Sequence, residues 1–192
     1  MSTHARAHLD ALRRALRSFE GETERIDAWG RELFGRLSAG GRLLTAGNGG
    51  SAAHAEHLAS ELVGRYRADR PPFSALALNV DGSALTALTN DYGPEQMFAR
   101  QVLAHARSDD VLIAFSTSGR SPNAVAAAHA AKGVGAVVWS FTGPAPNPLA
   151  DASTDVVAVD TEWTATVQEV HQVALHLLCA AFDRALVAAS PT

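Results

Sequence analysis

The chain begins with two series of apolar residues that recur at helical spacing. The first is Leu9, Leu12, Leu16 and Phe19, and the second is Ile26, Trp29, Leu33 and Leu37. Steps of three and four residues place apolar side chains on one face of a helix, so residues 4–38 are predicted to be helical. Gly21 lies between the series, and we expect it to separate two helices. Their apolar faces must pack on the rest of the chain or on a second copy of it.

Beyond residue 40, short apolar runs alternate with stretches of helical period. The runs predict strands at 42–46, 74–80, 111–116, 136–141 and 155–159. The helical stretches between and after them cover 51–66, 83–88, 95–106, 122–132 and 164–188. Alternating helices and nearly continuous apolar strands are typical of a parallel sheet buried on both faces. We therefore predict the α/β class, with one domain over 1–192 and with 1–38 as a helical extension used in oligomerisation.

Composition excludes several classes of protein. Of the 192 residues, 47% are hydrophobic and 19% are charged, which indicates a globular chain and not a disordered one. The formal charge of −4 gives no broad basic surface for nucleic acid or anionic membrane. We see no run of about 18 apolar residues that would span a bilayer. Acidic residues near the N-terminus argue against a transit peptide, so we expect a cytoplasmic protein. The single cysteine, Cys179, lies in an apolar helical stretch and is expected in the core.

The loop after the first predicted strand is a candidate anion site. In open parallel sheets, ligands bind beyond the carboxyl ends of the strands. Residues 46–51 read Ala-Gly-Asn-Gly-Gly-Ser, in which glycines allow close approach of a ligand and Ser51 is expected to cap the next helix. Two alternatives remain. The loop can be a tight turn without a ligand, or Gly47-x-Gly49-x-x-Ala52 with Asp81 can be a dinucleotide fingerprint.

The loop after the third predicted strand favours a phosphate. Residues 116–122 read Ser-Thr-Ser-Gly-Arg-Ser-Pro, with four hydroxyls before a helix. Ser121 is a suitable N-cap, and Pro122 suits the first helical position because its missing N–H costs nothing there. Hydroxyl donors at a helix N-terminus suit a phosphate monoester, and a capped turn alone does not need four of them. Two such loops favour a small phosphorylated ligand over a dinucleotide.

Two helical stretches carry candidate acid–base or metal-binding residues. His57 and Glu61 are four residues apart and share a face, as do Gln168, Gln172 and His176 on the last helix. Each group can be a surface hydrogen bond, a base with its orienting partner, or part of a zinc site. The rise from Gln168 to His176 is about 12 Å, so two ligands of one metal would have to reach toward each other. His171, on the same helix, is the alternative partner for the other candidate residues.

Taken together, these segments resemble the phosphoheptose isomerases of the SIS (sugar isomerase) superfamily. The matching segments are GNGGSAAHAEHLASELVGRY (47–66), LTNDYG (88–93), STSGRS (116–121) and TVQEVHQVALH (166–176), and the resemblance extends over about residues 1–188. It implies a three-layer α/β sandwich around a five-stranded parallel sheet, preceded by two N-terminal helices. It also implies a homotetramer with active sites between subunits, and isomerisation of sedoheptulose 7-phosphate to D-glycero-D-manno-heptose 7-phosphate.

The resemblance also assigns roles to residues. Glu61 and His176 match the catalytic base and acid. The zinc ligands implied are His57, Glu61, Gln168 and His176. The substrate-binding residues implied are Asn48, Gly49, Gly50, Ser51, Glu61, Arg65, Asn90, Asp91, Ser116, Thr117, Ser118, Ser121 and Gln168. Ala165 replaces an Asp of some relatives, which removes a possible proton relay.

Non-catalytic relatives provide the alternative function. Some SIS-domain proteins bind phosphosugars without turnover, and others associate with the bacterial replication initiator. The latter tend to lack the Glu and the final His. Glu61 and His176 are both present here, which favours the enzyme.

Overall fold

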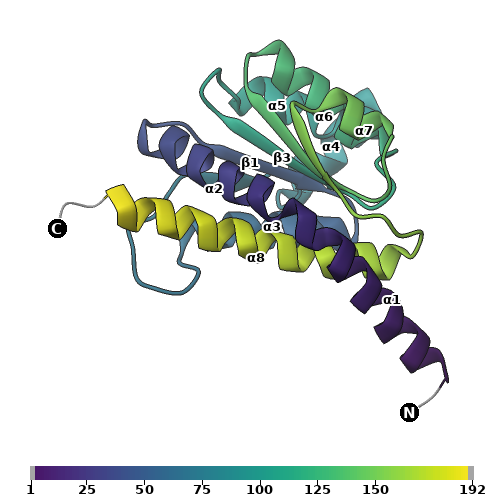
Figure 1. Cartoon of the computed structure of the whole chain (residues 1–192). Helices are drawn as coiled ribbons and strands as arrows, with labels where there is room; N and C mark the ends of the chain where they lie inside the picture. Colours follow the sequence, from purple (N-terminus) through teal and green to yellow (C-terminus); the bar gives the residue numbers. More distant parts are fainter. Residues whose placement is uncertain (1–2, 190–192) are drawn as a thin grey trace.

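The computed structural model describes residues 3–189 and contains a five-stranded parallel sheet (Figure 1). The strands are β1 (Leu43–Gly47), β2 (Ala75–Ala77), β3 (Val111–Ser116), β4 (Val137–Thr142) and β5 (Asp155–Ala158), in the spatial order β2-β1-β3-β4-β5. All neighbouring strands run parallel, with β1 between β2 and β3. Every residue of β1 and β3 is buried, because helices cover both faces of the sheet. The predicted α/β class is confirmed.

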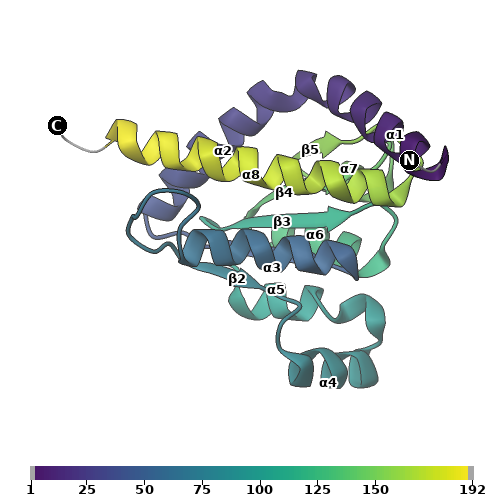
Figure 2. The same cartoon turned by 90° about the horizontal axis from the view of Figure 1, so that it is seen from below.

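The helices form a layer on each side of the sheet (Figures 1 and 2). They are α1 (Thr3–Phe19), α2 (Thr23–Ser38), α3 (Gly50–Val63), α4 (Gly82–Tyr92), α5 (Ala99–His105), α6 (Pro122–Gly133), α7 (Pro148–Ala152) and α8 (Thr164–Ala189), with short 3₁₀ turns at Glu20–Glu22 and Pro94–Gln96. One layer contains α2, α3 and α8, and the other contains α5, α6 and α7. Each layer packs its own apolar cluster against the sheet, so the core has two parts.

Several element boundaries differ from the sequence prediction. The second strand covers only Ala75–Ala77, because the chain turns after it and Asp81 caps α4 by accepting a hydrogen bond from the backbone N–H of Ala84. The helix after it continues to Tyr92 and ends at Gly93, whose φ is +86°. The short helix α7 is not among the predicted helical stretches, and it starts where the Asn147 side chain caps it by accepting from the N–H of Ala150.

The two N-terminal helices differ in how well the chain covers them. A 3₁₀ turn containing Gly21 separates α1 from α2, as predicted. All four apolar residues of the α2 series are buried, and Trp29 stacks on Trp139 with ring centroids 4.9 Å apart. Of the two alternatives expected for this face, α2 therefore takes the first and packs on the rest of the chain. On α1, by contrast, Leu9 remains 38% exposed.

Helix α8 is the central helix of its layer. It is the one described helix whose length and apolar composition would suffice to cross a membrane, so the expectation that no segment would suffice is wrong. Its apolar residues pack against α2 and the sheet, which accounts for that composition. The helices approach closely at Gly30, where an added Cβ would lie 2.3 Å from the Cβ of Ala181. Cys179 is buried here as predicted, and burial raises the pKa of its thiol.

Candidate active site

The two predicted anion loops meet at the carboxyl edge of the sheet. β1 and β3 are hydrogen-bonded neighbours, so the loops that follow them are adjacent. A pair of amide side chains joins the loops. Asn48 donates to Asn123 Oδ1 at 2.8 Å, and Asn123 donates back to Asn48 Oδ1 at 2.9 Å. Asn48, Ser121 and Asn123 line one side of a pocket of about 280 Å³. The reciprocal bonds hold the two loops in a fixed relation.

The loop after β3 turns sharply and brings two of its hydroxyls, those of Ser116 and Ser121, together. Gly119 has φ +61°, and an added Cβ would lie 2.0 Å from Asn147 Oδ1, so only glycine fits. The Oγ atoms of Ser116 and Ser121 lie 3.1 Å apart, and Ser118 Oγ accepts from the N–H of Arg120 at 3.1 Å. Ser121 is the N-cap of α6, as predicted, but its hydroxyl makes no capping bond. That hydroxyl therefore faces its neighbours in the loop.

The loop after β1 relies on glycine more than on a capping side chain. Gly49, with φ +55°, is the N-cap of α3. The predicted capping role of Ser51 is wrong, because Ser51 lies inside the first turn and is buried. Gly50 contacts the last helix, since an added Cβ there would lie 2.4 Å from Nε2 of Gln168. A side chain at position 50 would displace Gln168 from the loop.

The structure brings three predicted ligand residues together between α3 and α8. The ligand atoms of His57, Glu61 and His176 all lie within 4.8 Å of one another. His57 Nε2 and Glu61 Oε1 are 3.0 Å apart. Nε2 of Gln172 lies 3.1 Å from both His57 Nδ1 and His176 Nε2. These three residues and Gln172 are called the His–Glu–His cluster below.

The hydrogen bonds of the cluster determine where its protons lie. An amide nitrogen only donates, so His57 Nδ1 and His176 Nε2 both accept from Gln172. His57 therefore carries its proton on Nε2 and donates it to Glu61 Oε1. Burial lowers the pKa of His176, and the nearby His57 lowers it further, whereas Glu61 raises it.

This arrangement fits a cation. One ligand atom from each of His57, Glu61 and His176 lies within 4.8 Å of the other two, and imidazole nitrogen and carboxylate oxygen are atoms that zinc accepts as ligands. The second carboxylate oxygen of Glu61, Oε2, is buried and has no hydrogen-bond partner among residues 3–189. A buried anionic oxygen without a donor is costly unless something else compensates its charge. The cluster therefore has the donor set and the unmet charge of a metal site.

Other predicted residues lie outside the cluster. Gln168 packs on Gly50, one turn before Gln172, which makes the two contacts to the histidines. Arg65 lies beyond the end of α3, where it is exposed and donates to the carbonyl of Arg67 at 2.8 Å. Asn90 and Asp91, which we expected in a loop, form the exposed end of α4 and bond to each other at 2.9 Å.

Sequence reasoning missed two residues of this region. Gln172 belongs to the polar stack on the last helix, and its helical spacing to His176 was the available signal, although we assigned it no role. The sequence offered no signal for the role of Asn123, because Asn is a common residue near the start of helices. Its role depends on Asn48, 75 positions earlier in the chain.

Comparisons with known proteins agree with this geometry. The family model described as SIS domain matches residues 7–143. A phosphoheptose isomerase of Streptomyces coelicolor is 56% identical over 179 residues, which are 93% of this chain and 78% of that protein. A solved phosphoheptose isomerase of Neisseria gonorrhoeae has 36% identity and a TM-score of 0.86. The match covers 94% of this chain and 97% of that chain. A solved phosphoheptose isomerase of Francisella tularensis has 30% identity and a TM-score of 0.89. The match covers 96% of this chain and 100% of that chain. The chain belongs to the SIS-domain family, as a member of its phosphoheptose isomerases.

Proposed function

We propose that this protein isomerises sedoheptulose 7-phosphate to D-glycero-D-manno-heptose 7-phosphate. The observation that carries the proposal is the convergence of a carboxylate and two imidazoles within 4.8 Å, between the helices that border the two anion loops. Phosphate-binding loops at one end and acid–base groups at the other suit a phosphorylated sugar whose far end reacts. The names of relatives at up to 56% identity support the same reaction.

The reaction moves a proton between two neighbouring carbons. In the ketose, Glu61 takes a proton from C1 while His176 supplies one to the oxygen on C2, which yields an enediol. Glu61 then returns its proton to C2, and His176 takes the proton from the oxygen on C1, which leaves an aldehyde there. An imidazole suits this exchange, because its neutral form has one nitrogen that donates and one that accepts.

Zinc fits the cluster, with His57, Glu61 and His176 as ligands. When bound, zinc would supply positive charge that stabilises the enediolate oxygens. The resemblance assigns the fourth ligand to Gln168. The contacts of Gln172 with both histidines make it the competing candidate.

The reaction itself can be tested directly by NMR. Purified protein is incubated with sedoheptulose 7-phosphate in D₂O, and deuterium incorporation at C1 and C2 is followed together with the aldehyde product. Enediol chemistry predicts both signals, and treatment with a chelator should suppress them. A protein that binds the sugar phosphate and exchanges no proton would instead be a non-catalytic phosphosugar-binding protein.

Replacing both Ser118 and Ser121 by alanine should weaken binding of the phosphorylated sugar by about 100-fold or more. Hydrogen bonds to charged groups contribute about 1.5–3 kcal/mol each, and both hydroxyls belong to the loop assigned to the phosphate. Isothermal titration calorimetry measures the Kd. Binding of the unphosphorylated sugar should change little. Ser108→Ala, which removes an exposed hydroxyl elsewhere, is the control. Equal losses for both sugars would contradict the phosphate assignment.

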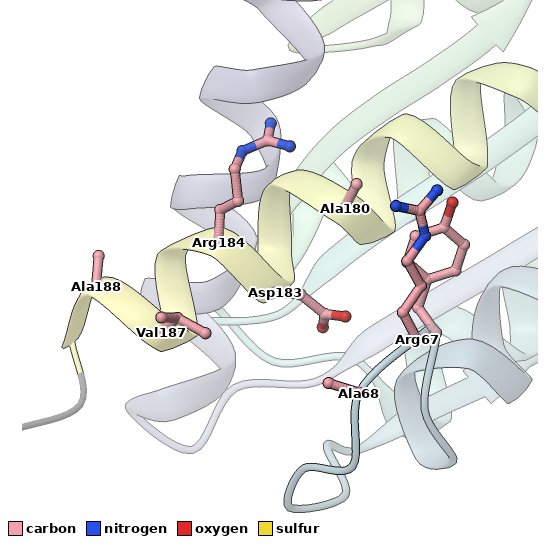
Figure 3. Close-up of a pocket in the computed structure, with 8 residues that line it drawn as sticks. Arg67, Ala68, Ala180, Asp183, Arg184, Val187 and Ala188 are labelled. Atoms are coloured by element: carbon pink, nitrogen blue, oxygen red, sulfur yellow. The ribbon is translucent and has the colours of Figure 1, made fainter.

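We also propose a homotetramer with active sites between subunits, in the cytoplasm and without nucleic-acid or membrane partners. None of the α4 residues is buried in the single chain, and this helix carries Asn90 and Asp91, which the resemblance assigns to substrate binding. A hollow of about 630 Å³ lies beside the end of α8, and its lining residues include Val187, which is 72% exposed (Figure 3). Leu9 on α1 adds further apolar surface. A second copy covering these surfaces would bring Asn90 and Asp91 to a neighbouring site.

Light scattering at micromolar concentration should give a mass near four chains. The exposed apolar surface on α1, α4 and α8 is the physical reason, because burial of such surface drives association. Val187→Asp, at the rim of the hollow, should shift the mass towards smaller species. The control is Leu103→Asp, which replaces an exposed apolar residue on α5. A stable mass near the 20.1 kDa of one chain would rule out the tetramer and the shared site.

A further inference from the structure

A pocket between α3 and α8 contains a histidine that the mechanism above does not use. The pocket has a volume of about 480 Å³ and is lined by Gly50, His54, Ala165, Gln168, Glu169 and Gln172. Gln172 belongs both to this wall and to the His–Glu–His cluster, so the pocket and the cluster adjoin. Ala165 has only a methyl group and leaves room in the pocket for a ligand.

His54 is a polar side chain of this wall without a hydrogen-bond partner. The residue is only 8% exposed, and none of residues 3–189 makes a hydrogen bond to its ring. Its Nδ1 is fully enclosed and unpartnered, whereas Nε2 is not among the enclosed atoms. The ring nitrogen that can reach a molecule in the pocket is therefore Nε2.

The neighbouring His171 shows what a structural histidine looks like in the same region. Its ring is fully buried, and its Nε2 donates to the carbonyl of Thr142 at 3.1 Å, while its Nδ1, like that of His54, has no partner among residues 3–189. Burial lowers the pKa of His171 to about 4, so it stays neutral. His54 packs against this ring at 6.2 Å and against Phe115 at 6.0 Å between centroids. Two fixed rings thus hold His54 in place, while its own hydrogen-bonding capacity remains unused.

His54 also lies at a useful place along the substrate path. It precedes His57 by three residues on α3, or about 4.5 Å along the helix axis. The Phe115 ring that supports it belongs to the residue just before Ser116, the first hydroxyl of the phosphate loop. His54 therefore packs against the strand that leads into the phosphate loop and lies on the helix that carries His57 and Glu61.

We propose that His54 is a positioning residue whose Nε2 hydrogen-bonds a hydroxyl in the middle of the bound sugar chain. The inference rests on the proposed sugar-phosphate substrate and deepens it. Burial lowers the pKa of His54, and the nearby His57 lowers it further, and both effects favour the neutral ring. A neutral imidazole pairs with a neutral hydroxyl without desolvating a charge. The bond would align C1 and C2 with the cluster, because the phosphate alone holds only the opposite end.

The test compares three substitutions of His54. His54→Phe keeps an aromatic ring between Phe115 and His171 and removes both nitrogens. His54→Gln places an amide near the position of Nε2, and His54→Asn places one near Nδ1. Calorimetry measures the Kd for sedoheptulose 7-phosphate and for inorganic phosphate, so the readout does not require turnover. Thermal unfolding checks that each variant is folded.

We expect the Phe and Asn variants to raise the Kd for the sugar phosphate by about tenfold, as the loss of one hydrogen bond predicts. His54→Gln should stay within about threefold of the unmodified protein, and the Kd for inorganic phosphate should stay constant throughout. His129→Phe, at an exposed position on α6, is the matched control. If His54→Phe does not fold, the comparison between Gln and Asn decides.

Two results would overturn the proposal. One is an unchanged Kd for the sugar phosphate in the folded Phe variant, or equal values for Gln and Asn. The other is an equal loss of inorganic phosphate binding, which would mean that His54 only supports the phosphate loop. If the unmodified protein binds the sugar phosphate but does not isomerise it, the proposed reaction fails while the role of His54 is still measured.

Discussion

Replacing Glu61 by glutamine is expected to leave a folded protein that binds sedoheptulose 7-phosphate and isomerises it at least about 10³-fold more slowly. Glutamine has nearly the same shape and still offers an oxygen, but it cannot accept a proton from carbon. General base catalysis contributes about 10²–10⁴-fold, and Glu61 has no second carboxylate beside it in the His–Glu–His cluster. Deuterium exchange at C1 and the Kd for the substrate are the two measurements.

The same helix provides the control for this experiment. Glu56 lies on α3, is exposed, and accepts a hydrogen bond from Asn79. Glu56→Gln removes the same charge from the same helix and should leave turnover nearly unchanged. If Glu61→Gln keeps substantial isomerase activity, Glu61 is not the base and the proton transfers given above are wrong.

Removal of His57 should produce the second large effect, the loss of bound metal. Protein purified without chelator should carry close to one zinc per chain, and His57→Ala should lose most of it. Two imidazoles and a carboxylate within 4.8 Å form most of a four-coordinate site, so the loss of one ligand leaves too few. Metal analysis by mass spectrometry measures zinc per chain, and His129→Ala, at an exposed histidine, is the control.

Two glutamine variants identify the fourth ligand. If the resemblance is right, Gln168→Ala lowers zinc content and Gln172→Ala does not. If Gln172 instead stays beside both histidines around the ion, Gln172→Ala lowers zinc content and Gln168→Ala does not. Full zinc content in His57→Ala, or protein that binds no zinc in any form, would refute the metal site as proposed here.

The sequence was most informative where local pattern and burial agree. The strands β1 and β3 lie between two helical layers, so their residues are nearly all apolar, and a nearly continuous apolar run was visible. The spacing of the two N-terminal series and the break at Gly21 were visible for the same reason. β2 was overestimated, because Leu78 is buried beyond the end of the strand and extends the apolar run.

Sequence was less informative where a role depends on a distant neighbour. Gln168 and Gln172 are chemically identical and share a helix face, so spacing alone could not separate them. Gly50 approaches Gln168 closely, whereas His57 and His176 contact Gln172. The same limit applies to Asn123, whose partner Asn48 is on another element. Such roles are set by how helices pack, which local pattern does not encode.

By itself, the sequence determined the α/β class, the two hydroxyl and glycine loops, and the helical positions of His57, Glu61 and His176. These features follow from periodicity and from residue types whose backbone and hydrogen-bonding preferences are local. Only the tertiary structure decided that α3 and α8 bring those three side chains within 4.8 Å, and that His54 is enclosed without a partner beside them. The reason is that α3 and α8 are separated by about 100 residues of sheet and helix, and only the packing of that sheet sets the distance between them.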